Sequence, residues 1–164
     1  PSESDQRILE ARSLWQNYPK DPCRSLARLD ILWRSPTGVI ALELKCVAKW
    51  KADTYGYEFL KDIHRLERMC AVRGLSDPVD TRFAAFVTSD RAYWDPETRT
   101  EPAVFRICDG RRLPAGYWVQ YTQPSPWTRW IDYPPFELAH PYEFSWTEIG
   151  RGIRLLLIEV QPRA

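Results

Sequence analysis

The sequence has few of the residues that build cysteine clusters or histidine-based catalytic sites. It contains four cysteines and two histidines among 164 residues, and no two cysteines form a CxxC motif. Because no Cys or His ligands occur at zinc-binding spacing, we do not expect a structural zinc site. The cysteines fit a reducing compartment, although spacing alone leaves a disulfide open. Cys46 lies in an apolar pattern that predicts a small core residue.

Long hydrophobic runs are also missing. The longest aliphatic run, Leu155 to Ile158, is far shorter than the about 20 residues that a membrane helix needs. The first 15 residues carry charges throughout, unlike a signal peptide. From these two absences we expect a cytoplasmic protein with no membrane association.

Neither sign of charge dominates, because 23 Lys and Arg face 22 Asp and Glu, which gives a formal net charge of +1. Any basic surface for nucleic acid must therefore be local. Glycine is scarce at seven residues, whereas 14 prolines and eight tryptophans indicate long, stiff loops. The length, with 44% hydrophobic and 27% charged residues, predicts one folded domain over 1–164.

Residue periodicity predicts the order of the elements. The expected elements are a helix over 4–14, a β-hairpin over 25–47, a helix over 57–73 closed by Gly74, and strands over 82–88 and 153–160. The hairpin turn is Ser35-Pro36-Thr37-Gly38. The Trp- and Pro-rich stretch 91–150 is expected to form irregular strands and loops packed on the core.

The predicted hairpin carries ionisable residues inside apolar strands. Asp30 lies in the first strand, and Glu43 and Lys45 interrupt the second. Such charges are costly unless they are paired or bind a metal. Glu43 and Lys45 are two residues apart and so project from the same sheet face. Asp30 and Glu43 are 13 residues apart across a short turn, so their carboxylates can converge.

Two carboxylates and one ammonium group on one face are the groups that a metal-dependent phosphodiesterase needs. The carboxylates can hold a hard divalent cation. The metal and the lysine then activate water and offset charge on the scissile phosphate. A plainer alternative is that Glu43 and Lys45 form ordinary ion pairs on a half-exposed sheet face.

The segments Arg28-Leu29-Asp30-Ile31 and Ala41-Leu42-Glu43-Leu44-Lys45 together resemble the D…ExK signature of PD-(D/E)XK, or restriction-endonuclease-like, nucleases, without the proline before Asp30. Residues 57–67 are similar to the helix that follows this signature in many uncharacterised bacterial members, and 153–160 resemble their closing strand. The resemblance implies an α/β fold (α+β) with a central mixed β-sheet flanked by helices. The Trp- and Pro-rich region would be a C-terminal elaboration.

Carried over by position, the resemblance implies that Asp30 and Glu43 are metal ligands and that Lys45 positions or activates water. The backbone carbonyl of Leu44 would complete the metal shell, and the cofactor would be Mg²⁺ or Mn²⁺. The implied activity is endo- or exonucleolytic cleavage of phosphodiester bonds, with DNA favoured over RNA. A bacterial defence or repair setting, with a homodimer or a larger defence assembly, follows by the same analogy.

Further residues would complete such a site. The family often adds an acid from its first helix, for which the candidates are Glu10 and Glu3. The basic residues expected to border the nucleic acid are Arg28, Lys49, Lys51, Lys61 and Arg65. For Arg65 two interpretations stay open, a phosphate contact or an ion pair with Asp62 at the helix surface. His64 is expected to be a packing residue.

Two other functions stay open. One is a catalytically inactive nuclease-like fold that serves as a nucleic-acid or protein interaction module. Convergence of Asp30, Glu43 and Lys45 with a third acidic group would favour the enzyme over this module. The other is a structural domain of a larger assembly, which predicts an exposed aromatic patch instead of a charged cleft.

Overall fold

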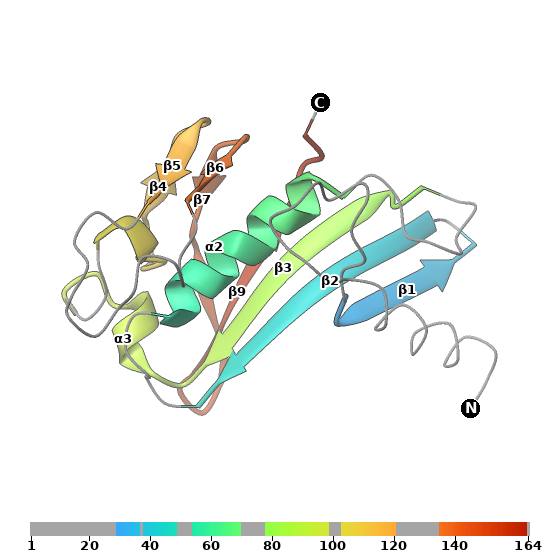
Figure 1. Ribbon diagram of the computed structural model, residues 1–164. Coiled ribbons are helices and arrows are strands. Elements are labelled where there is room, and N and C mark those ends of the chain that lie inside the picture. The colour runs from blue at the N-terminus through green and yellow to red at the C-terminus, as the bar shows by residue number, and fades with distance from the viewer. Residues whose placement is uncertain are drawn as a thin grey trace.

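A five-stranded mixed sheet forms the centre of the computed structural model, which describes residues 29–36, 38–48, 54–69, 78–98, 103–120 and 135–163 (Figure 1). The strands, in their order across the sheet, are β1 (Ile31–Ser35), β2 (Gly38–Val47), β3 (Thr81–Thr88), β9 (Ile153–Glu159) and β8 (Trp146–Gly150). Only β2 and β3 pair in parallel; the other neighbouring pairs are antiparallel. The chain is thus a mixed α/β fold, as expected.

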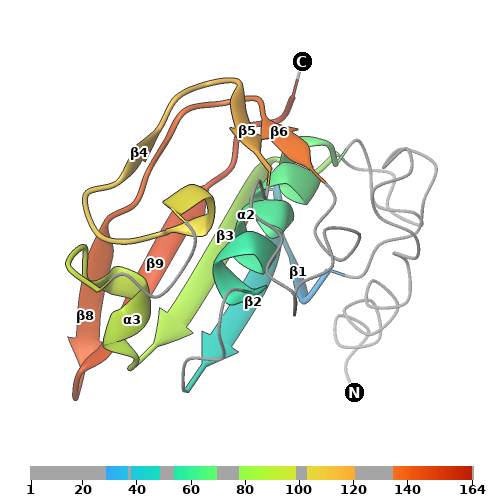
Figure 2. The ribbon, with the colours of Figure 1, turned by 60° about the vertical axis from the view of Figure 1, so that its left-hand side comes forward.

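Helix α2 (Thr54–Glu67) lies across one face of the sheet, and short elements pack around it (Figures 1 and 2). These are α3 (Arg91–Trp94), η1 (Ala103–Phe105), β4 (Arg112–Leu113), β5 (Tyr117–Val119), β6 (Phe136–Leu138) and β7 (Tyr142–Glu143). β4 pairs with β7 and β5 pairs with β6. In the described part of the chain, no helix is long and apolar enough to cross a membrane.

Helix α2 is buried on two sides because its apolar residues face two layers. Phe59 packs on Phe86 of β3, with ring centroids 5.6 Å apart. Tyr57 packs on Phe105 of η1 at 5.2 Å and on Phe136 of β6 at 5.5 Å. A helix between two layers must be apolar over much of its circumference. The fully buried side chains of α2 include Tyr57, Phe59, Leu60, Ile63 and Leu66.

The end of α2 differs from the sequence prediction. The helix was expected over 57–73, but it runs from Thr54 to Glu67. The buried Glu67 carboxylate ties this end to the segment between β6 and β7. It accepts hydrogen bonds from the backbone N–H groups of Ala139 (2.9 Å) and His140 (3.1 Å) and from the Tyr142 hydroxyl (2.8 Å). Local periodicity could not predict these contacts, because the partners lie more than 70 residues away.

The β1–β2 hairpin forms at the predicted turn, with Ser35 opposite Gly38. Gly38 has φ +148°, and a Cβ at this position would lie 2.5 Å from Oδ2 of Asp80. The same Asp80 oxygen accepts a hydrogen bond from the Val39 N–H at 2.7 Å. The turn therefore requires glycine both for its backbone conformation and for this close approach.

The other predicted elements are confirmed where the structure describes them. The strand expected over 82–88 is β3, and the strand expected over 153–160 is β9. β8, which pairs with β9 at the sheet edge opposite β1 (Figure 2), comes from the region expected to be irregular. The helix expected over 4–14, the start of the hairpin over 25–28 and the helix end at Gly74 lie outside the described residues.

The sheet face opposite α2 is apolar and partly open. Trp33 of β1 is 52% exposed and Leu157 of β9 is 50% exposed, with Leu44 of β2 between them in the sheet order. Cys46, which was predicted to be a core residue, is exposed. The prediction was wrong because alternation along β2 buries Val47 and turns Cys46 to the other face.

Candidate active site

The face of β2 that α2 covers carries both Glu43 and Lys45. Along β2, Val39, Ala41, Glu43 and Val47 are buried, and Lys45 between them is partly buried. Glu43 is only 6% exposed. Because side chains alternate along a strand, Glu43 and Lys45 share this face, as their spacing predicts.

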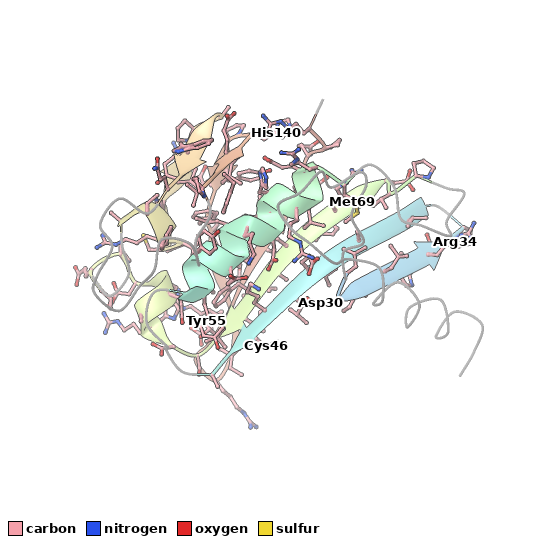
Figure 3. All side chains as sticks on the ribbon, in the orientation of Figure 1. Asp30, Arg34, Cys46, Tyr55, Met69 and His140 are labelled. Carbon is pink, nitrogen blue, oxygen red and sulfur yellow. The ribbon has the colours of Figure 1, made fainter. Side chains whose placement is uncertain are left out.

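Asp30 lies immediately before β1 and is exposed (Figure 3). Its Oδ2 accepts a hydrogen bond from the backbone N–H of Leu44 at 2.8 Å. The β1 pairing ends at Leu42, so the Asp30 carboxylate binds a β2 N–H group just beyond the ladder. The Asp30 carboxyl also contributes to the raised pKa of Glu43, so the two side chains are neighbours. The two carboxyl groups therefore converge.

Helix α2 adds Asp62 and Arg65 to these residues. Lys45 Nζ lies 2.7 Å from Asp62 Oδ2. Arg65 donates from Nη1 to Asp62 Oδ1 at 3.0 Å, and its Nη2 lies 3.4 Å from Glu43 Oε1. Lys45, Asp62 and Arg65 thus form a chain of opposite charges, and Arg65 ends it beside the Glu43 carboxyl group.

The predicted Asp62–Arg65 ion pair exists, but Asp62 is not at the helix surface. Its side chain is buried, and the residue is 3% exposed. The surface placement was wrong because α2 packs against the sheet on this side, where Lys45 contacts Asp62. No sequence signal pointed to this role, because the helical spacing put Asp62 with Lys61, Arg65 and Arg68 on the polar side of the helix.

Burial controls the protonation of this network. Burial, together with the nearby Asp62 carboxylate, raises the pKa of Glu43 to about 9, against the lowering effect of Arg65. Glu43 is therefore protonated at neutral pH. Burial alone would lower the pKa of Lys45, but Asp62 outweighs burial, so the pKa lies above its ordinary value. Lys45 is thus an ammonium group.

The donor chemistry fits a hard divalent cation. Asp30 and Glu43 supply carboxylate oxygens at one place, and the exposure of Asp30 gives access from solvent. Positive charge there would favour the ionised form of Glu43. Among the described residues, no group of three or more His, Cys, Asp or Glu side chains is arranged to hold a metal ion. A cation would therefore need backbone or water oxygens as well, and the Leu44 carbonyl remains a predicted ligand.

Of the residues predicted to border nucleic acid, the structure describes Lys61 and Arg65. Lys61 pairs with Glu58 at 2.5 Å, and its ammonium lies 5.5 Å from the Tyr57 ring centre. Arg65 points inward to Asp62 and Glu43. The remaining candidates lie outside the described residues: Arg28, Lys49, Lys51 and the acids Glu10 and Glu3. A basic edge at Lys49 and Lys51 stays a prediction.

His64 is a packing residue, as expected. Its ring lies 5.0 Å from the Phe136 ring, and Nδ1 makes a 2.8 Å hydrogen bond with the Glu137 carbonyl. Burial lowers the pKa of His64 to about 4, so the ring is neutral at pH 7. A neutral ring that donates from Nδ1 joins α2 to β6.

Comparison of the chain with protein-family models, with curated proteins and with solved structures yields no match. The resemblance to the PD-(D/E)XK signature thus rests on the motif residues themselves. Any functional assignment has to come from the geometry around Asp30, Glu43 and Lys45.

Proposed function

We propose that the protein is a divalent-metal-dependent nuclease with a restriction-endonuclease-like core, which hydrolyses phosphodiester bonds and prefers DNA to RNA. The supporting observation is that the Asp30 and Glu43 carboxyls meet on the β1–β2 hairpin, with the Lys45 ammonium on the same strand face as Glu43. Ionisable groups gathered at a partly buried position are costly to a fold. They are found more often at functional sites than elsewhere.

In the proposed site, Asp30 and Glu43 hold Mg²⁺ or Mn²⁺, with the Leu44 carbonyl as a further oxygen ligand. When bound, the cation polarises the phosphate and lowers the pKa of a bound water. Lys45 positions that water or offsets the negative charge that develops on the phosphate. The exposed Asp30 leaves one side of the carboxyl pair open to a polymeric substrate. A homodimer or defence assembly stays a prediction from the resemblance, and a cytoplasmic location stays a prediction from the sequence.

Nicking of a supercoiled plasmid tests this proposal. Wild-type protein should nick the plasmid with Mg²⁺ or Mn²⁺ and stop when EDTA is added. Asp30→Asn should lose this activity, because the amide removes one anionic metal ligand. The matched control is Glu143→Gln, which neutralises a carboxylate in an exposed ion pair with Arg112. Equal nicking by wild type and Asp30→Asn would contradict the assignment.

A second candidate, a catalytically inactive interaction module, is favoured by one observation. The apolar sheet face with the exposed side chains Trp33, Leu44 and Leu157 has the character of a protein contact surface. Under this alternative, replacing Trp33 and Leu157 with serine should abolish partner binding or self-association, whereas EDTA should have no effect. Metal-dependent cleavage that survives the double replacement would favour the nuclease.

A further inference from the structure

Asp62 uses each of its carboxylate oxygens for a different cation. Oδ2 contacts the Lys45 ammonium at 2.7 Å, and Oδ1 accepts a hydrogen bond from Arg65 at 3.0 Å. Both cations lie on the Glu43 side of the strand: Arg65 Nη2 is 3.4 Å from Glu43 Oε1, and Lys45 follows Glu43 on the same face of β2. One buried carboxylate therefore sets the place of the two positive groups beside the carboxyl pair.

The Lys45 side chain needs such a partner. Lysine carries its charge on a flexible stem with four carbons, and its ammonium is a point charge without a preferred geometry. If Asp62 did not hold the ammonium, Glu58 and Glu43 would be its alternative partners, because after Asp62 these two carboxyl groups act on it most strongly. An ammonium paired directly with Glu43 would occupy an oxygen that a metal cation needs. One paired with Glu58 would move about one turn along α2 from its place at Asp62.

We propose that Asp62 is a positioning residue of the active site. From α2 it holds the Lys45 ammonium beside the Asp30–Glu43 carboxyl pair without letting it occupy that pair, and it holds Arg65 against Glu43. This inference rests on the proposed nuclease function. Asp62 contacts Lys45 and Arg65, so its effect on the reaction passes through these two cations.

The variant Asp62→Glu tests the proposal most cleanly. It keeps the negative charge but moves the carboxylate by one methylene, so the ammonium is displaced while local electrostatics are largely retained. A displacement of about 1 Å can cost about 100-fold in rate, so kcat for plasmid nicking should fall by 10-fold to about 100-fold, with KM and the Mn²⁺ Kd changed by less than about threefold. Glu143→Asp, the reverse one-methylene change in an exposed ion pair, is the control and should keep wild-type kcat.

Asp62→Asn provides the second variant. It removes the charge, so kcat should fall at least as far as in Asp62→Glu, and circular dichroism shows which variants are folded. If Asp62→Asn does not fold, the result for Asp62→Glu decides.

Three results would overturn the inference. A folded Asp62→Glu protein with wild-type kcat means that Asp62 is only structural, even if its Tm is lower. A parallel loss of kcat and Mn²⁺ affinity, measured by calorimetry with Mn²⁺ alone, means that Asp62 is a metal ligand. Wild-type protein that neither binds Mn²⁺ nor nicks plasmid removes the nuclease function and the inference with it. That failure is distinct, because it appears before any change at Asp62.

Discussion

The neutral His64 side chain, which joins α2 to β6, predicts how the stability of the fold depends on pH. The unfolded chain takes up a proton near the ordinary His pKa of 6.5, whereas the folded chain resists protonation until the pH reaches about 4. Between these values the unfolded state binds more protons than the folded state. The free energy of unfolding therefore falls as the pH falls from 6.5 to about 4, and this contribution is fully present above 6.5.

The magnitude follows from the two pKa values. Each pKa unit is worth about 1.4 kcal/mol, so the gap between 6.5 and about 4 corresponds to a loss of about 3 kcal/mol at the acid end. This is a large part of the about 5 to 15 kcal/mol that stabilises a typical domain. The main cause is burial: protonation puts a charge into a buried site beside the Phe136 ring and near the Arg68 and Arg163 charges. The hydrogen bond to the Glu137 carbonyl offsets only part of this cost.

Urea unfolding at a series of pH values measures this effect. His64→Gln keeps an N–H donor for the Glu137 carbonyl but cannot titrate, so the difference between wild type and variant isolates His64. That difference should shift by about 3 kcal/mol between pH 7 and pH 4. The control His140→Gln removes the other histidine and should retain the wild-type slope. If the wild-type and His64→Gln curves run parallel across this range, His64 is not the buried neutral group described above.

Three further predictions concern other residues. Lys45→Ala should abolish metal-dependent nicking, and it should lower stability by about 1 to 3 kcal/mol, because buried Asp62 loses a charged partner. Glu67→Gln should cost about 1 to 3 kcal/mol in urea unfolding, because an amide NH₂ at Oε2 would face the Ala139 N–H. Replacing Lys49 and Lys51 with Glu should reduce the slope of log binding constant against log salt concentration for duplex DNA by about one to two units. Each phosphate contact that is lost changes this slope by about 0.9.

Each of these predictions has a contradicting result. Nicking by Lys45→Ala at the wild-type rate would remove Lys45 from the mechanism, and Arg112→Ala, an exposed cation in an ion pair, is its control. Equal stability of Glu67→Gln and wild type would mean that the Glu67 contacts do not hold the helix end. An unchanged salt slope in the Lys49 and Lys51 variant would show that nucleic acid does not run along this edge.

Local sequence patterns predicted the parts of the site that lie close together in the chain. Alternation placed Glu43 and Lys45 on one face of β2, and turn chemistry at Gly38 predicted the hairpin that brings Asp30 to Glu43. The same alternation was misapplied at Cys46, because an apolar neighbourhood was taken to mean burial on both sheet faces. The exposed apolar face shows that hydrophobic residues are not a sufficient sign of burial.

The parts that depend on distant contacts could not be predicted. Asp62 is buried because α2 packs against the sheet, where Lys45 of β2 contacts it. The spacing of residues within the helix does not reveal this contact. The end of α2 at Glu67 depends on hydrogen bonds to the segment after β6, and β8 is a strand because β9 pairs with it. Tertiary packing decided these features over local propensity.

The most direct test of the central claim is a crystal soaked in Mn²⁺ and measured for anomalous scattering. The proposed site predicts a Mn²⁺ peak between the Asp30 and Glu43 carboxylates, at about 2.0 to 2.3 Å from the ligating oxygens. The peak should disappear in crystals of Asp30→Asn. No peak at saturating Mn²⁺, or a peak only elsewhere on the molecule, would contradict the assignment of a metal-dependent nuclease built on Asp30, Glu43 and Lys45.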